Sequence, residues 1–142
     1  MKHKSVSSLS AIFLSIAIAG FIVAFIVTNS PASNAGKWMA PASANNMKNP
    51  VAKTPVSIQD GRKIFNKECS SCHGPKGLGN GPKAGDLNIQ PSNLASHLVQ
   101  SQSDGAIFWK ITTGNKPMPT FRTAYSDQDR WNLVNFVRTL GK

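Results

Sequence analysis

Two cysteines and a histidine form the most reactive group of residues in the sequence, Cys69-Ser-Ser-Cys72-His73. Thiols at this spacing can each add to a vinyl group of one haem, and the histidine that follows directly can ligate the iron of the same haem. The pentapeptide therefore predicts one covalently attached c-type haem, with His73 as an axial ligand of its iron.

Other uses of the cysteine pair are disfavoured by what the chain lacks. A structural zinc site needs four ligands, whereas the pentapeptide supplies three and no second cysteine pair exists. An iron–sulfur cluster likewise needs four ligating residues. A thioredoxin-like dithiol belongs in a βαβ unit, but the residues around this pair indicate a helix followed by a glycine-rich loop.

The second axial ligand is predicted to be Met118, which stands between Pro117 and Pro119. The two prolines exclude helix and favour an extended segment, so the thioether can be presented to the iron from the face opposite His73. Two alternatives remain: Met118 fills a gap in the core, or His97 is the second ligand. His97 lies in an amphipathic helical pattern, where a histidine on the polar face is the more common case.

The elements that position these residues are predicted to be helices. Ser57-Ile58-Gln59-Asp60 has the form of a capping box and begins a helix that leads to the cysteines. Gly61 costs about 1 kcal/mol relative to alanine inside a helix. Its presence therefore indicates that another helix crosses closely at this point.

Three further helices are predicted: one over 92–99, one from Ser103 to Gly114, and one that begins at Ser126. The last helix opens with a second capping box, Ser126 to Asp129, and its apolar residues repeat at helical spacing. No strand-like alternation of convincing length occurs. The fold class predicted for residues 57–142 is therefore all-α.

The amino-terminal segment carries a membrane signal. An uninterrupted apolar stretch runs from Leu9 to Val27, preceded by Lys2, His3 and Lys4. It is longer than the apolar region of about 7–15 residues in a signal peptide and close to the length of a membrane-spanning helix. Residues 1–28 are therefore predicted to anchor the chain, with the remainder exported to the periplasmic side. Cleavage near Ala35, which would release a soluble periplasmic protein, is the alternative.

Residues 29–56 are rich in proline, alanine and asparagine. Such a composition predicts a flexible tether between the membrane segment and the domain. Within it, Trp38 and Met39 are candidates for contact with the membrane interface or with a partner subunit.

The charge is strongly unbalanced, with 16 Lys and Arg against 6 Asp and Glu and a formal net charge of +10. This excess favours an acidic protein partner or an anionic lipid surface. Nucleic acid is not a predicted partner, because no helix-turn-helix, zinc-finger or aromatic RNA-binding pattern accompanies the charge. A charge that only keeps the protein soluble is the alternative. The basic residues expected to surround the haem edge are Lys76, Lys83, Lys116 and Arg122.

Residues 57–142 resemble the monohaem class I cytochromes c of bacteria. The resemblance rests on five features in the family's order, which are the helix with Gly61 and Phe65, Cys69-Ser-Ser-Cys72-His73-Gly74, Gly81-Pro82, Gly114 followed by Met118-Pro119, and the terminal helix with Leu133 and Phe136.

The resemblance implies a class I cytochrome c fold wrapped around one covalent haem c. It implies that the first helix crosses the last, with Gly61 and Phe65 against Leu133 and Phe136. It also implies that the Pro82 carbonyl accepts a hydrogen bond from the His73 ring. The cofactor-binding set is then Cys69, Cys72, His73, Pro82 and Met118.

The expected function is one-electron transfer by a His/Met-ligated haem, because two axial ligands leave no position for a substrate. The protein is predicted to be a membrane-tethered electron carrier of a respiratory or photosynthetic chain. The alternative is a cytochrome c subunit of a larger membrane oxidoreductase complex. Neither hypothesis makes the chain an enzyme by itself.

Overall fold

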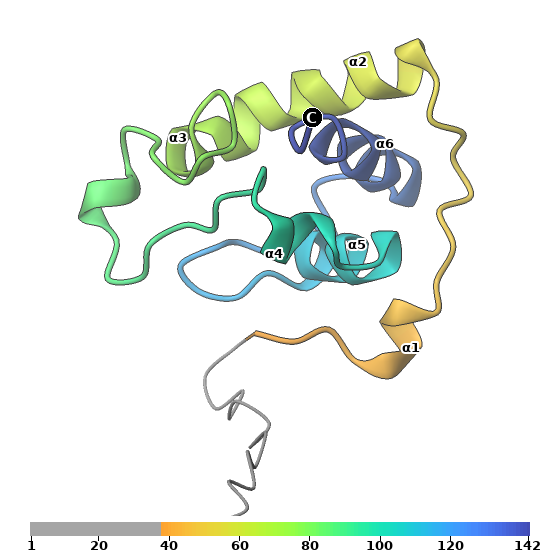
Figure 1. Ribbon diagram of the computed structural model, residues 1–142, viewed down its shortest axis with the longest axis horizontal. Coiled ribbons are helices and arrows are strands. Elements are labelled where there is room, and N and C mark those ends of the chain that lie inside the picture. Colours follow the sequence, from red (N-terminus) through yellow and green to blue (C-terminus); the bar gives the residue numbers. More distant parts are fainter. Residues whose placement is uncertain (1–37) are drawn as a thin grey trace, which may run out of the picture. The chain divides into compact units, whose positions relative to one another are not determined.

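The computed structural model describes residues 38–142 (Figure 1), and these residues fold as helices joined by loops. The all-α prediction is confirmed, and an isolated bridge between Asn115 and Met118 is the single β feature of this part of the chain. The elements are α1 (Ala42–Asn45), α2 (Pro55–Ile64), the π-helical turn η1 (Phe65–Cys69), α3 (Ser70–His73), the 3₁₀ turn η2 (Ala84–Asp86), α4 (His97–Gln100), α5 (Asp104–Thr113) and α6 (Asp127–Val137).

Helix α2 begins earlier than predicted. Its N-cap is Thr54, whose side chain accepts a hydrogen bond from the Ser57 amide, while the Ser57 hydroxyl accepts one from the Thr54 amide. Pro55 occupies the first helical position, where its missing N–H has no cost. The predicted box at Ser57 is wrong, because Ser57 lies inside the helix and its amide is already bound by the Thr54 side chain. Helix α2 continues through η1 into α3, so the cysteine pair lies at the end of one long helical rod.

Helices α2 and α6 cross in direct backbone contact at Gly61. A Cβ atom on this residue would lie 2.0 Å from the carbonyl oxygen of Asn132. One turn further on, Phe65 is fully buried and its ring centroid lies 5.0 Å from that of Phe136. The predicted crossing is therefore confirmed, and the close approach is the reason for a glycine at this position.

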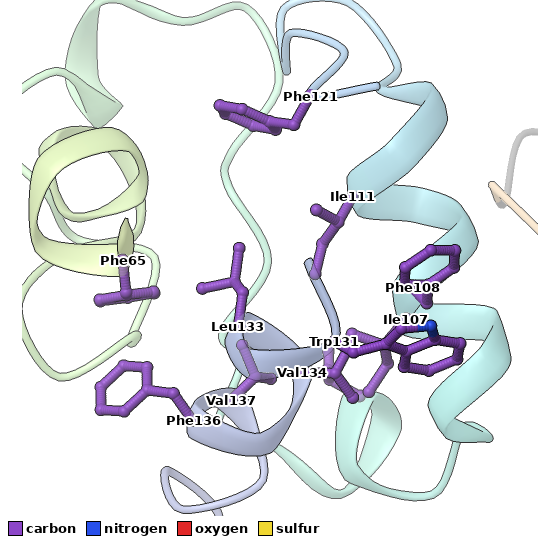
Figure 2. Packing of buried hydrophobic residues seen from close by; sticks show 11 residues of the cluster. Phe65, Ile107, Phe108, Ile111, Phe121, Trp131, Leu133, Val134, Phe136 and Val137 are labelled. Atoms are coloured by element: carbon purple, nitrogen blue, oxygen red, sulfur yellow. The ribbon is translucent and has the colours of Figure 1, made fainter. Parts of the chain in front are cut away.

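Helix α5 packs on α6 through its apolar face (Figure 2). Its boundaries agree with the prediction: Ser103 caps the first turn, and Gly114 ends the helix with a φ of 66°. The Phe108 ring stacks on Trp131 with centroids 4.0 Å apart. Helix α4 is shorter than predicted, because the Asn93 side chain accepts a hydrogen bond from the Ala95 amide and holds the preceding residues in a turn.

Residues 38–54, which we call the strap, pack on the helical core. Ala44 is 2% exposed, and its carbonyl lies where a Cβ atom on Gly105 would sit. The Asn49 side chain donates a hydrogen bond of 2.8 Å to the Asn135 side chain on α6. The predicted flexible tether is therefore wrong for this segment. The polar composition of the strap does not indicate that its small residues and amide side chains fit against the core.

The predicted membrane segment, residues 1–28, and the start of the predicted tether lie outside the described residues. Between residues 38 and 142, none of the helices has the length and apolar character needed to cross a bilayer.

The crossing at Gly61 gives the first test. Replacing Gly61 by alanine adds about 1 kcal/mol of helix propensity but forces a methyl group into the Asn132 carbonyl, and such overpacking costs about 1–3 kcal/mol. The Asn132 carbonyl belongs to the backbone of α6 and cannot rotate away from the new methyl group as a side chain could. We therefore expect the free energy of unfolding, measured by chemical denaturation, to fall by about 1–2 kcal/mol. The control is Gly85→Ala, where a Cβ meets nothing within 4 Å. Equal stability of the two variants would contradict the close crossing.

Candidate functional site

The two cysteines and His73 occupy the end of the α2–η1–α3 rod. Cys69 is the N-cap of α3, and the chain turns away directly after His73 at Gly74, whose φ is 77°. A Cβ on Gly74 would lie 2.4 Å from the Asn80 side-chain oxygen, so only glycine fits this turn. The short helix therefore presents both thiols and the imidazole at one place.

The surroundings of Cys69 disfavour the thiolate, which is the reactive form of a cysteine. Burial, aided by the nearby Glu68 carboxylate and the Cys72 sulfur, raises the pKa of this thiol to about 12. A redox-active dithiol requires a thiol pKa below the usual value. The environment of the pair therefore agrees with a thiol that is consumed in a covalent bond rather than cycled.

The orientation of His73 is set by a backbone carbonyl. Its Nδ1 lies 3.0 Å from the carbonyl oxygen of Ser92, which can only accept, so Nδ1 carries the proton and Nε2 is free to bind a metal. Burial lowers the pKa of His73, although the bond to Ser92 opposes this shift. The neutral imidazole, the form that ligates iron, is therefore favoured.

The predicted role of Pro82 is wrong. The acceptor for the His73 ring is the Ser92 carbonyl, not the Pro82 carbonyl. The residues on either side of Pro82 are bound to α3 instead, with the Lys83 amide donating to the Ser71 carbonyl at 2.8 Å. The segment with Ser92 is brought against the loop by a 2.6 Å bond from the Leu94 amide to the Gly77 carbonyl.

Met118 is held in a tight turn rather than in the extended segment predicted. Its amide donates to the Asn115 carbonyl at 2.9 Å, and the Asn115 amide donates back to the Met118 carbonyl at 3.0 Å. A Cβ on Gly114 would lie 2.5 Å from the Pro119 carbonyl, so the turn closes tightly on the end of α5. The backbone that carries the thioether is thereby fixed on both sides of Met118.

Two cavities of about 200 Å³ and about 300 Å³ share five lining residues, which are Trp38, Cys69, His73, Ser92 and Met118. We call the two together the crevice. His97, the alternative ligand, is exposed and lines neither cavity. Apolar side chains form most of the remaining wall of the smaller cavity, namely Phe65, Leu94, Leu98, Val99, Ile107, Ile111, Leu133 and Val137.

These residues fit a haem. The walls are apolar, two thiols stand at the crevice, and the donor set is one imidazole nitrogen with one thioether sulfur, the pair that holds iron in cytochromes c. Between residues 38 and 142 no cluster of three or more His, Cys, Asp and Glu side chains could hold a metal ion, as a zinc site would require.

Three residues that line the crevice were not predicted to lie at the site. Trp38 stands in a segment whose composition predicted a tether, and it lines both cavities. Gln102, which precedes α5, and Lys110, a charged residue within α5, line the smaller cavity. Only the packing of the strap and of α5 around the crevice reveals them.

Comparison with known proteins agrees with this site. The family described as "Cytochrome C oxidase, cbb3-type, subunit III" matches residues 56–137. Cytochrome c6 of Alaria esculenta is 30% identical over 84 residues, which cover 59% of this chain and 92% of the relative. Cytochrome c6 of Bumilleriopsis filiformis is 29% identical over 82 residues, which cover 58% of this chain and 90% of the relative.

Among solved structures, a chain of the reducing HAO-like protein complex Kustc0457/Kustc0458 of Kuenenia stuttgartiensis is similar, with a TM-score of 0.59 and 29% identity. The similar region covers 68% of this chain and 50% of that chain, so this chain matches half of that longer protein.

The fold and the site define a small monohaem c-type cytochrome, whose cofactor is one covalently bound haem c. The chain belongs to the family described as cytochrome c oxidase, cbb3-type, subunit III, whose match covers more than half of its length. Its activity is electron transfer by a c-type haem.

Covalent attachment can be tested on denaturing gels stained for haem. The wild type should give a stained band, and Cys69→Ala/Cys72→Ala should lose it, because no thiol remains to form a thioether. The matched control is Ser70→Ala/Ser71→Ala, which alters the two intervening residues and should keep the stain. A stained band from the double cysteine variant would contradict the assignment.

Proposed function

We propose that the protein passes single electrons through a haem ligated by His73 and Met118, while tethered to the exported face of a membrane by residues 9–27. The observation that carries this proposal is that His73 and Met118, from two separate segments, line the same apolar crevice. Two axial ligands leave no coordination position for a substrate, which suits a carrier rather than an enzyme.

When bound, the haem supplies an iron that alternates between the ferric and ferrous states. The protein's own residues position the two ligands and surround the haem. The Ser92 carbonyl holds the His73 ring in one orientation, and the turn at Asn115 holds Met118. The apolar walls exclude water. Rigid ligands change little between the two oxidation states, which keeps electron transfer fast.

The membrane tether rests on sequence alone. The apolar stretch from Leu9 to Val27 has the length of a spanning helix, with lysines on its amino-terminal side. Export places the haem domain in the periplasm, where its carrier function would be exercised in a respiratory or photosynthetic chain. Cleavage near Ala35 would leave the same domain soluble in that compartment.

A second candidate function is that of a cytochrome c subunit in a membrane oxidoreductase complex. Two observations favour it: the family is described as subunit III of an oxidase, and a similar solved structure is part of a complex. The two candidates differ in one measurement. A carrier purified in mild detergent migrates alone, whereas a subunit migrates with other chains.

The axial assignment is tested by comparing Met118→Ala with His97→Ala. A thioether favours ferrous iron, so the wild type should show a relatively high potential and the weak near-infrared band of sulfur-ligated ferric haem. We expect Met118→Ala to lose the band and lower the potential, and His97→Ala to change neither. The opposite pattern would move the second ligand to His97.

An acidic partner surface is the proposed docking target. Of the basic residues in the loops, Lys116 is exposed and lines the larger cavity of the crevice. Lys76 is exposed on a separate groove beside Arg62 and Leu140. A positive charge at the mouth of the crevice would accelerate encounter with a negative surface more than it would strengthen the complex.

This electrostatic steering can be measured with ferricyanide, an anionic oxidant. The rate of oxidation should fall as ionic strength rises past about 0.1 M, where the Debye length is roughly 10 Å. Lys116→Glu should slow the reaction at low salt while leaving the visible spectrum intact. Lys76→Glu, with the same change of charge, should have a smaller effect. A rate independent of salt and of both variants would mean that the charge only maintains solubility.

A further inference from the structure

The smaller cavity of the crevice has one polar end. Lys110 and Gln102 line it together with Trp38, in a wall that is otherwise mostly apolar. The Lys110 ammonium donates a hydrogen bond of 2.6 Å to the Gln102 side-chain oxygen. It also lies 5.5 Å from the centroid of the Trp38 ring. A cation is therefore held in a defined position where the crevice meets the strap.

The Lys110 ammonium at this end of the crevice can pair with an anionic ligand group in addition to its contacts with Gln102 and Trp38. Lys110 is the single Lys or Arg side chain among the described residues that line this cavity. Desolvation of a charge is costly unless an opposite charge or hydrogen bonds offset it. A haem carries two propionate carboxylates, and an unpaired carboxylate in an apolar crevice would meet the same cost.

Gln102 is itself held in place. Its side-chain amide donates to the Leu98 carbonyl at 3.0 Å, and its own backbone carbonyl accepts from Arg138 at 2.5 Å. Arg138 in turn binds the Asp104 carboxylate at 2.6 Å. The residue that orients Lys110 is thus anchored to α4 and to the end of α6, and through Arg138 it is linked to the start of α5.

Trp38 covers this end of the crevice. Its ring packs against Trp109, with centroids 6.1 Å apart and planes at 50°. The strap that carries Trp38 is fixed further on by Ala44 beneath Gly105 and by Asn49 on Asn135. The indole is therefore part of the folded domain, and its ring lies beside the Lys110 ammonium at this end of the crevice.

We propose that Lys110, Gln102 and Trp38 form the binding site for one carboxylate of the haem. The Lys110 ammonium pairs with the carboxylate, Gln102 orients the ammonium, and the Trp38 indole covers the pair. Lys110 is a binding residue, and Trp38 and Gln102 are positioning residues. The inference rests on the proposed function, because it concerns the same haem.

The site has an electrostatic consequence for the iron. A fixed positive charge in a covered crevice disfavours the additional positive charge of ferric iron, so it raises the reduction potential. Removing the ammonium leaves the carboxylate unpaired and stabilises the ferric state. Removing the indole admits water, which screens the ammonium and favours the charged ferric state as well.

The test is a redox titration of the full-length haem protein, followed in the visible spectrum. Lys110→Met should lower the midpoint potential, with the equilibrium constant for reduction falling by about tenfold. The matched control is Lys76→Met, which removes an exposed charge outside the crevice and should change this constant by less than about twofold. Lys110→Arg keeps the charge and should restore most of the wild-type potential.

Trp38 is tested through its coupling to Lys110. Trp38→Ala should lower the potential, and Met39→Ala, its exposed neighbour in the strap, should not. Because the indole acts by covering the pair, the effect of Lys110→Met should be smaller in the Trp38→Ala background than in the wild type. Trp38→Phe, which keeps an aromatic cover, should stay close to the wild type. Additive effects of the two substitutions would overturn the role of Trp38.

Two results would overturn the carboxylate site. One is a potential of Lys110→Met equal to that of Lys76→Met. The other is a loss of thermal stability in Lys110→Met with an unchanged potential, which would make Lys110 a structural residue only. If Lys110→Met does not retain haem, the same comparison is made with Lys110→Gln. Failure of the proposed function looks different, because the wild type would then lack covalent haem or the Met118→Ala variant would keep its spectrum.

Discussion

The contact between the backbones of α2 and α6 is the constraint on which the rest of the molecule depends. Gly61 brings α2 against the Asn132 carbonyl, and no side chain separates the two helices there. From that point the direction of α2 is set, and its continuation carries Cys69 and His73 to the crevice. The same crossing sets Phe65 against Phe136, so one glycine determines both the centre of the core and the position of the cysteine pair.

The core and the cofactor site are largely one surface. Phe65, Val99, Ile111 and Leu133 belong to the buried cluster and also line the crevice. A domain of this size has little apolar surface to spare, so a ligand that completes its core stabilises the folded state in proportion to its affinity. The segments that carry His73 and Met118 are also held by backbone hydrogen bonds.

Polar residues extend this arrangement to the strap. The Asn135 side chain is 2% exposed, and its amide donates to the Ser57 hydroxyl at 3.1 Å and to the Val51 carbonyl at 3.2 Å. One buried amide thus joins α6, α2 and the strap. The strap is held by hydrogen bonds and close backbone contacts rather than by large apolar side chains, and it ends with Trp38 at the crevice.

Local patterns in the sequence determined the helical class, the c-type haem attachment motif from Cys69 to His73, the start of α6 and the glycine at the helix crossing. Each of these follows from residues within a few positions of one another, through capping, spacing or helix periodicity. Only the tertiary structure decided that Ser92 rather than Pro82 orients His73, that residues 38–54 pack on the domain, and that Trp38 and Lys110 meet at the crevice. These contacts join residues far apart in the chain, and they depend on how backbone carbonyls and small side chains fit together. A pattern of apolar and polar residues does not encode such a fit.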